Sequence, residues 1–491
     1  MDADKSLKLR DAYDSKIDAY LAAVRLLREQ RNADCSQTRA LPTEILSKIF
    51  GVLVHHFNSQ GERYPHIKWM AVTHVCRSWR TLAFNEPTLW TDLTSVHRKF
   101  FPDIFARTQT APLILNYDHL QYPDTLRLIS DHIVEYPERM KKLSLCFKAP
   151  PLSLLNKPAP FLESLVIYPH EEFPPDFLGG AAPRLQSLIC NGKLPLEAKW
   201  LAAVTKLDCR VVHLESTWLS NLTSLRFHPC WIPLDAIKGG TRLISMEILL
   251  SALEKMPLLQ CLDLNFPHEM DLRTCERLNP VYLRDLRDLT VHFRSKPQMS
   301  SIFNHLKVDG LERLTTSWAG YAEPALFEPA CRFFGANYHG DGLQYWRRAK
   351  DAVEIYRTWD PSAEASPVLV FESDHLDHLA RISSLLPQSS PRIFQAGNTE
   401  LLKCDTIEEL HITSSTALSA LFDLGDAFAT IYPSLRLLRL EGFKFKARVL
   451  KDWLLEQSSS VQLFVKNCGL SAKDSESLQA LRGVHCPSTR G

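Results

Sequence analysis

One leucine pattern recurs along most of this chain and restricts the folds open to it. The pattern is L-x-x-L-x-L, with Met, Ile, Val, Phe or Cys at some leucine positions, and its copies lie at 140–145, 162–167, 185–190, 222–227, 259–264, 286–291, 407–412 and 435–440, with a shortened copy at 311–314. A weaker copy lies at 206–209, and 243–248 is a poorer candidate. Many successive copies are separated by roughly 20–29 residues, a spacing typical of stacked repeats.

Within each copy the apolar residues alternate with others, which is the period of a strand with one buried face. Helical stretches such as 245–255 and 447–457 lie between copies. One strand with one helix cannot bury its own apolar face, whereas stacked copies share a continuous core. We therefore predict an α/β repeat array over residues 96–491, with one strand and one helix in each repeat.

Two copies extend to a longer pattern that ends in a cysteine, Leu222-x-x-Leu225-x-Phe227-x-x-Cys230-x-Ile232 and Leu463-x-Val465-x-x-Cys468-x-Leu470. In this form the region resembles irregular leucine-rich repeats. The resemblance implies a solenoid in which that cysteine lies inside the turn and contacts the neighbouring coil. The residue between the last two leucines of each strand is expected to face outward along a concave sheet. Such residues are candidates for binding a target protein, or are simply solvated: Arg226, Asp263, Thr290, Thr315, His411 and Arg439.

The array has a divergent stretch near 318–405, where the pattern is lost. A helix is expected at 343–357 and a strand at 368–371. Degenerate repeats and an inserted pair of loops both fit this stretch. Residues 360–367 are expected to form an exposed loop.

The region before the array has a different period. Ile45, Leu46, Ile49, Phe50 and Leu53 form an apolar stripe that predicts a helix starting at Pro42, followed by a loop over 55–68. Apolar residues from Val72 to Ala83 predict a second helix, which Asn85-Glu86-Pro87 ends. Such a short module has little interior, so some of its apolar side chains should stay uncovered and mark an interface.

This module, over residues 38–95, resembles an F-box through three blocks: Leu41-Pro42-x-Glu44-Ile45-Leu46-x-x-Ile49-Phe50, Val75-Cys76-Arg77-x-Trp79-Arg80 and Pro87-x-Leu89-Trp90. The arrangement is similar to F-box proteins of mushroom-forming fungi, although its loop between the first two helices is longer than usual. The resemblance implies docking onto a Skp-type linker of a cullin–RING ubiquitin ligase. Residues expected to contact this linker, or else to form the module's own core, are Leu41, Pro42, Ile45, Leu46, Ile49, Val75, Cys76, Trp79 and Trp90.

An N-terminal helix is predicted within residues 1–37, at 5–33. Its apolar stripe consists of Leu9, Tyr13, Ile17, Tyr20, Leu21, Val24 and Leu27. The stripe fits packing back onto the same protein, which we favour at this length, or a short coiled coil with another chain.

Charge and composition exclude several classes of function. The formal net charge of +1 does not direct the whole chain to nucleic acid or an anionic membrane. No apolar run reaches the roughly 18 residues that span a bilayer, and the charged N-terminus lacks the apolar core of a secretory signal. We expect an intracellular protein, cytoplasmic or nuclear, whose 12 cysteines are mainly small buried side chains.

Motifs for catalysis and metal binding are lacking. The chain has no H-E-x-x-H, Walker-type phosphate loop, G-x-S-x-G or G-x-G-x-x-G. The tetrapeptide 339–342, the histidine pairs at 55–56 and 374–378, and the arginines at 347–348 beside Tyr345 and Trp346 are better explained as turns, solvated surface and buried aromatics. We expect no enzyme, no cofactor and no metal. The predicted function is a ligase adaptor that recruits a target protein; the alternatives are a repeat scaffold outside any ligase, or an enzyme with an unrecognised site.

Overall fold

The computed structural model describes most of the chain and divides it into two compact units, Met1–Ser144 and Leu145–Gly491. The described residues are 2–35, 41–59, 68–94, 96, 99–118, 135–146, 152–169, 171–210, 214–228, 245–266, 272, 277–293, 295–322, 327–338, 343–348, 352–356, 367, 369–376, 386, 389–397, 401–456, 461–480 and 484–485. Each unit is described by itself.

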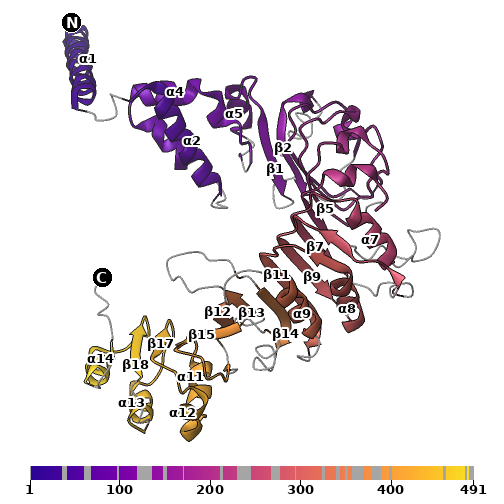
Figure 1. Cartoon of the computed structure of the whole chain (residues 1–491). Coiled ribbons are helices and arrows are strands. Elements are labelled where there is room, and N and C mark those ends of the chain that lie inside the picture. The colour runs from indigo at the N-terminus through magenta and orange to yellow at the C-terminus, as the bar shows by residue number, and fades with distance from the viewer. Residues whose placement is uncertain are drawn as a thin grey trace. The chain divides into compact units, whose positions relative to one another are not determined.

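The first unit is mainly helical (Figure 1). Its elements are α1 (Asp2–Cys35), α2 (Thr43–Ser59), η2 (Met70–His74), α4 (Arg77–Asn85), η3 (Pro87–Trp90), α5 (Phe101–Arg107), β1 (Leu113–Asp118), η4 (Pro137–Arg139) and β2 (Met140–Cys146), where η marks a 3₁₀ helix. The helical module is joined to β1 by backbone hydrogen bonds, from Leu93 N–H to the Ile114 carbonyl at 2.8 Å and from Ile114 N–H to the Thr91 carbonyl at 2.9 Å.

The module has an aromatic core. Phe50 of α2 is fully buried and meets Trp79 edge-on at a centroid distance of 5.1 Å. Trp69 and Trp90 form a second edge-on pair at 4.9 Å, and the Trp90 indole N–H donates to the Ala83 carbonyl at 2.7 Å. Each ring therefore buries apolar area in a favoured pair geometry, and the buried Trp90 indole has its hydrogen bond, whereas the buried Trp69 indole N–H has no partner among the described residues.

Two of the predicted boundaries in the module are wrong. Helix α2 continues to Ser59, through the start of the loop expected at 55. The second predicted helix is split into η2 and α4, because Cys76 has extended backbone angles (φ −155°, ψ 172°) and its sulfur accepts the Trp79 N–H as the N-cap of α4. Helix α4 ends at Asn85, as the following Glu86-Pro87 predicts.

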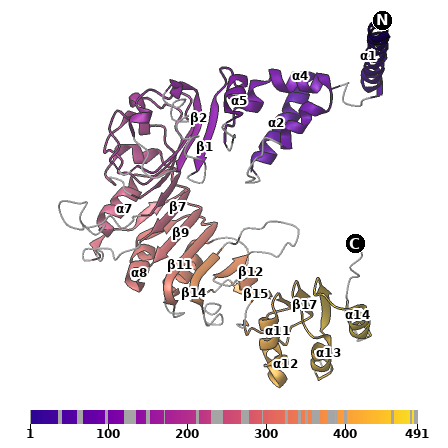
Figure 2. The same ribbon diagram turned by 180° about the vertical axis from the view of Figure 1, so that it is seen from behind.

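The second unit consists of strands that return through 3₁₀ turns or helices (Figure 2). Its elements are η5 (Leu152–Leu155), β3 (Ser164–Ile167), η6 (Phe177–Gly180), β4 (Ser187–Cys190), η7 (Lys199–Leu201), β5 (Lys206–Cys209), η8 (Thr217–Asn221), β6 (Ser224–Phe227), α7 (Met246–Glu254), β7 (Cys261–Asn265), β8 (Val281–Leu283), β9 (Asp288–Phe293), α8 (Lys296–His305), β10 (Leu306–Val308), β11 (Arg313–Ala322), α9 (Glu328–Asn337), β12 (Leu343–Arg348), β13 (Ala352–Tyr356), β14 (Leu369–Leu376), β15 (Ser389–Ala396), β16 (Glu409–Ile412), α11 (Ser415–Phe422), η12 (Gly425–Ala427), α12 (Phe428–Ile431), β17 (Leu437–Glu441), α13 (Ala447–Glu456), β18 (Gln462–Lys466), α14 (Ala472–Gln479) and β19 (Val484–His485).

Consecutive strands pair in parallel, as the repeat predicts. The order β3-β4-β5-β6-β7-β9-β11 is parallel throughout, and so is β15-β16-β17-β18-β19. The middle leucines are in register from strand to strand and at most 2% exposed: Leu165, Leu188, Leu207, Leu225, Leu262, Leu289 and Leu314. Burying each leucine is worth about 1.5–3 kcal/mol, so the row favours this register over any slipped one.

The earliest repeats differ from the predicted strand-plus-helix unit. Between β3 and β6 the described returns are the 3₁₀ turns η6, η7 and η8, and an α-helix, α7, first appears after β6. A single 3₁₀ turn fits between closely spaced strands, because these turns have only three to five residues. The poorer candidate strand at 243–248 falls instead at the start of α7, with Ser245 as the N-cap.

The divergent stretch contains strands where a helix was expected. Residues 343–357 include β12 and β13, which pair in antiparallel fashion. Val353 and Ile355 are fully buried on either side of the half-buried Glu354, so this segment has the period of a strand. Strand β14 covers most of the predicted 368–371 segment and pairs with β13 in antiparallel fashion and with β11 in parallel. Strand β12 pairs in parallel with β15 and returns the sheet to the regular repeat.

Several sequence expectations lie outside the described residues. They concern the loop at 360–366, the tetrapeptide at 339–342, the side chains of Tyr345, Trp346 and the 374–378 histidines, and the Cys230 position. The second cysteine of the longer pattern is described. Cys468 is buried, and its thiol donates to the carbonyl of Leu440 on the neighbouring strand at 3.5 Å.

The cysteines generate a prediction on reactivity. The described cysteines are free thiols, among which Cys35 is exposed and Cys190, Cys209 and Cys331 are buried. Burial raises the pKa of Cys331 to about 12, and burial also raises those of Cys190 and Cys209. Because the thiolate is the reactive form, a maleimide should label Cys35 at once and these three only after unfolding. Peptide mapping measures this, and rapid native labelling of Cys190 would contradict the buried strand.

Candidate functional site

An apolar stripe remains uncovered on α2 although the module has a complete core. Ile45, Ile49 and Val52 follow one another at i, i+4 and i+7, so they share one face of the helix. Their exposed fractions are 41%, 41% and 69%. We call these three residues the α2 outer stripe. Val75, between η2 and α4, is exposed to 59%.

Polar contacts hold α2 against the other helices. Ser47 donates to Glu86 at 2.9 Å, and Glu86 also accepts the hydroxyl and the backbone N–H of Thr88. The hydrogen bond from Thr88 lowers the pKa of Glu86, burial opposes this, and the Ser47 bond adds to the lowering. Elsewhere in the module, Arg107 lies over the rings of Phe84 and Trp90, with its guanidinium carbon 4.1 and 5.1 Å from the centroids. The outer stripe is therefore carried by a braced helix.

The open face of the second unit holds a polar hollow of about 400 Å³ over β4 to β11. Four of the predicted outward residues line it, namely Arg226, Asp263, Thr290 and Thr315. They are brought together because register pairing aligns Arg226 with Asp263, Asp263 with Thr290 and Thr290 with Thr315. We call this the sheet hollow.

Charges in the sheet hollow form a network around Asp263. Arg226 donates to Asp263 at 2.9 Å and to Asp208 at 3.4 Å. The His228 and His292 Nε2 atoms lie 3.7 and 3.6 Å from the two Asp263 oxygens. Burial of Asp263 raises its pKa, but His292, His228 and Arg226 more than offset this and hold the pKa below its ordinary value of 3.8. The same carboxylate gives Arg226 a raised pKa despite the opposing effect of its burial.

Comparison with known protein families identifies the helical module. The F-box-like family model matches residues 38–95. These residues form an F-box-like domain. A search of solved structures finds a leucine-rich-repeat protein of Leptospira interrogans at 12% identity, covering 77% of this chain and all of that one, with a TM-score of 0.24. The search of curated proteins finds no match.

In the F-box-like domain, the nine residues predicted to contact the linker fall into three groups by burial. Leu46 and Trp90 lie in the domain's own core, which is the second of the two roles that the sequence left open for these residues. Trp79 and Cys76 are half-buried and serve inside the domain, one against Phe50 and one as the α4 N-cap. Pro42, Ile45, Ile49 and Val75 are exposed, and Leu41 is half-buried. The stripe residue Val52 escaped prediction because it lies outside the F-box sequence blocks.

The other two predicted target-binding residues lie apart from the sheet hollow, on β16 and β17. His411 is buried, with 3% of its surface exposed, and pairs with Glu409 at 3.2 Å. Arg439 is half-buried, with its guanidinium carbon 4.5 Å from the centroid of the Phe464 ring. The expectation that His411 faces solvent is wrong. Its position in the leucine repeat gives the direction in which the side chain points, but it does not say whether other residues cover that side chain.

Sequence reasoning missed four of the six charged residues that line the sheet hollow. Lys206, Asp208, Asp288 and Arg313 line it, and His228 and His292 border it. Most of these residues lie two positions from a predicted one, and side chains two apart share a face of a strand. Extending each prediction by two residues in both directions would have found most of the network.

The chemistry available to the sheet hollow is recognition. Ser317, His292 and Asp263 are in line, with Ser317 Oγ hydrogen-bonded to His292 Nδ1 and His292 Nε2 beside Asp263. However, Ser317 lies in the interior of β11, whose backbone pairs with β9 on one side and β14 on the other, so nearby amides are not free to stabilise an oxyanion. Across the described residues, no cluster of three or more His, Cys, Asp or Glu side chains is arranged to hold a metal ion.

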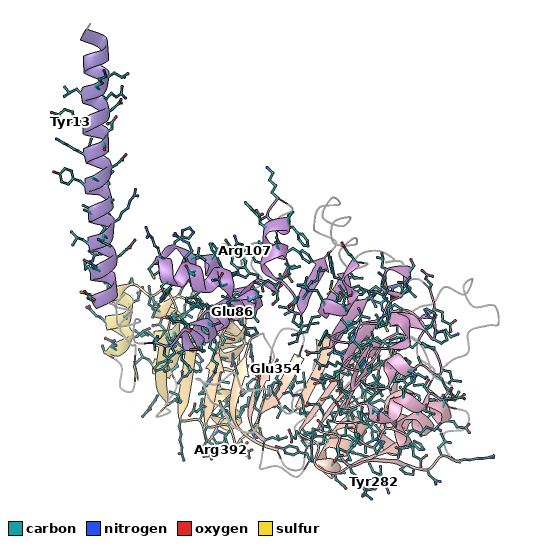
Figure 3. The ribbon with its side chains drawn as sticks, turned by 90° about the horizontal axis from the view of Figure 1, so that it is seen from above. Tyr13, Glu86, Arg107, Tyr282, Glu354 and Arg392 are labelled. Carbon is teal, nitrogen blue, oxygen red and sulfur yellow. The ribbon has the colours of Figure 1, made fainter. Side chains whose placement is uncertain are left out.

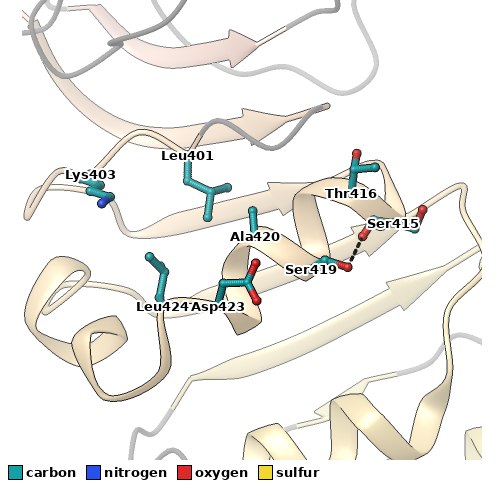
Figure 4. Close-up of a pocket in the computed structure, with 8 residues that line it drawn as sticks. All are labelled: Leu401, Lys403, Ser415, Thr416, Ser419, Ala420, Asp423 and Leu424. Atoms are coloured by element: carbon teal, nitrogen blue, oxygen red, sulfur yellow. Dashed lines mark hydrogen bonds between the residues drawn. The ribbon is translucent and has the colours of Figure 1, made fainter.

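A second hollow of about 500 Å³ lies beside α11 (Figure 4). Its lining combines the hydroxyls of Ser415, Thr416 and Ser419 with Leu401, Ala420 and Leu424, and with the charges of Lys403 and Asp423. Ser419 already donates to the Ser415 carbonyl at 3.1 Å. This lining pairs no nucleophile with a base, and no predicted residue falls in it.

Among the described helices, none is long and apolar enough to cross a membrane.

The lowered pKa of Asp263 predicts a pH-dependent contribution to stability. Replacing Asp263 by Asn should lower the free energy of unfolding by about 1–3 kcal/mol at pH 7, since it removes charge-assisted contacts. Because the folded pKa lies below 3.8, this contribution is present above pH 3.8 and is lost as the pH falls through the folded value. Urea denaturation of the wild type and D263N from pH 7 to pH 3 measures it. The control Asp452→Asn, at an exposed side chain on α13, should change stability little at any pH.

Proposed function

We propose that this chain is the substrate-recognition adaptor of an SCF-type cullin–RING ubiquitin ligase. The F-box-like domain docks a Skp-type linker, and the strand array holds a target protein close to the ligase. The observation that carries the proposal is the α2 outer stripe, because a domain with a filled core and a braced helix still exposes three apolar side chains in line. Exposed apolar patches of this kind mark protein interfaces.

The docking surface that we propose consists of the α2 outer stripe with Leu41, Pro42 and Val75. These side chains belong to the F-box-like sequence blocks or extend them, and they are the ones that the domain's own core leaves accessible. Cys76 and Trp79 support the surface from behind rather than forming it. The resemblance to F-box proteins of mushroom-forming fungi stays a prediction, and the ligase role implies action in the cytoplasm or nucleus.

The target-binding surface that we propose is the sheet hollow. Its charges are arranged in alternating sign along the middle row, with Arg226 between Asp208 and Asp263. Within the described part of the chain, Asp263 Oδ1, His228 Nε2 and Arg313 Nε are buried and have an ion-pair neighbour at 3.6–3.7 Å, but no partner within hydrogen-bond distance. Buried polar atoms are costly unless paired, so a polar segment of a bound protein would gain by supplying these partners. The array thus contributes proximity rather than bond-making.

Charge placed on the α2 outer stripe should abolish docking. Ile49→Asp is expected to weaken linker binding at least roughly tenfold, about 1.4 kcal/mol, because the carboxylate loses its water in the interface. Calorimetric titration with a purified Skp-type linker measures this loss of affinity. The matched control is Ile248→Asp on α7, since Ile248 has the same exposed fraction of 41% in the second unit. Its linker affinity should equal that of the wild type.

Double substitution of Leu41 and Pro42 by Ala should also abolish linker binding while the strand array stays folded. If the wild type itself binds no linker, or if I49D binds it at full affinity, the docking assignment is wrong. Specific capture of a target without any linker would favour the alternative function, a repeat scaffold outside the ligase.

Charge reversal in the sheet hollow should affect target and linker differently. Arg313→Glu places a fourth carboxylate beside Asp288, Asp263 and Asp208, so target recovery in quantitative co-purification should fall at least roughly tenfold. Linker recovery should stay unchanged. The control Arg448→Glu lies on α13, where the arginine is 93% exposed, and should recover the target fully. Equal losses in both variants would contradict the sheet hollow as the binding surface.

A further inference from the structure

The stripe on α1 has the spacing of a coiled-coil seam. Tyr13, Ile17, Tyr20, Val24 and Leu27 alternate steps of four and three residues, which is the a/d pattern of a heptad repeat. All five are between 43% and 73% exposed. Figure 3 shows the labelled Tyr13 pointing away from the helix. An apolar line of this length on a helix of 34 residues leaves much of the helix's apolar surface in water.

The described contact of α1 with the F-box-like domain leaves this seam free. Glu29 pairs with Arg77 at 3.0 Å, and Glu29 occupies the outermost position of the heptad, opposite the seam. The remaining outer positions carry mostly polar or small residues, including Asp11, Asp18 and Arg25, and Leu26 is an exposed apolar exception. The helix thus has one face for the domain and another for a partner, and the two uses do not compete.

We propose that the seam pairs with α1 of a second copy of this chain in an antiparallel coiled coil. A twofold axis near residue 22 sets Ile17 against Leu27 of the second copy, and Tyr20 against Val24. Each layer occurs twice by symmetry, as in any isologous interface. Every apolar a or d residue between 17 and 27 then meets an apolar partner: Ile17 faces a leucine of equal size, and Val24 faces the larger Tyr20.

Charge complementarity selects this orientation. In the antiparallel pair, Asp14 and Arg28 both flank the seam and lie opposite each other across the two copies, once at each end. A parallel pair would instead place Lys16 beside Leu21 and Ala23 beside Arg28, which joins no opposite charges. Within its own helix Asp14 lies 3.8 Å from Arg10, and both side chains are largely exposed, so the carboxylate remains accessible to Arg28 of the second copy. The antiparallel pair also sets Leu21 against its own counterpart beside the axis.

The mass of the full-length chain in solution tests the proposal. Sedimentation equilibrium should show the mass rising with concentration from 56.0 kDa towards twice that value. Val24→Glu puts a carboxylate in the seam and should hold the chain at the single mass. Ala22→Glu, on the outer face of the same helix, is the matched control and should dimerise as the wild type does. Circular dichroism verifies that both variants fold.

A charge exchange tests the orientation. Asp14→Arg sets two arginines against each other at each end and should raise the dissociation constant several-fold. Adding Arg28→Asp restores opposite charges and should restore dimerisation, whereas a parallel pair would respond to neither change. A wild-type chain that stays at the single mass at its highest soluble concentration, or a V24E chain that still dimerises, would overturn the proposal. Dimerisation should persist in I49D, so this test is independent of docking.

Discussion

The in-register pairing of parallel strands around one row of buried leucines is the constraint on which the second unit depends. Each repeat presents Leu or a similar residue to the core at every second position, and the strand backbones hydrogen-bond to their neighbours at one fixed register. A slip by one residue would turn Leu225 to solvent and Arg226 into the core, so the apolar row also fixes every outward side chain. The sheet hollow is a consequence of that row: Asp208, Arg226 and Asp263 meet because Leu207, Leu225 and Leu262 are buried beside them.

The divergent stretch shows how the sheet continues where the pattern fails. Strands β14 and β12 take the places next to β11 and β15, and β13 runs antiparallel between them. Leu369 pairs with Leu314 and is fully buried, so the leucine row extends into β14 without an L-x-x-L-x-L copy. A hairpin thus replaces a repeat while the backbone ladder remains unbroken between these strands, and the buried row continues from Leu369 to Ile355 of β13.

In the F-box-like domain, one helix contributes apolar residues both to the domain's core and to its exposed surface. On α2, Leu46, Phe50 and Val54 are buried, while Ile45, Ile49 and Val52 are exposed. The sequence presents both sets as one broad stripe, because adjacent apolar residues such as Ile45 and Leu46 differ by only about 100° around the helix axis. The aromatic pairs formed with Trp79 and with Trp69 decide which side becomes core. Likewise, pattern alone marks His411 as outward, although the folded structure buries it beside Glu409.

The sequence by itself determined the strand array, the position of the F-box-like domain, the N-terminal helix and the outward direction of Arg226, Asp263, Thr290 and Thr315, because each follows from periodicity along a short segment. Only the tertiary structure decided that 343–356 forms two strands, that Leu46 and Trp90 are core, and that His228, His292, Asp288 and Arg313 complete a charged hollow around Arg226 and Asp263. These outcomes depend on residues far apart in the chain: burial is set by what packs against a side chain, and a charge network by which strands become neighbours. Local pattern gives the direction in which a side chain points, and the fold supplies the partner that it meets.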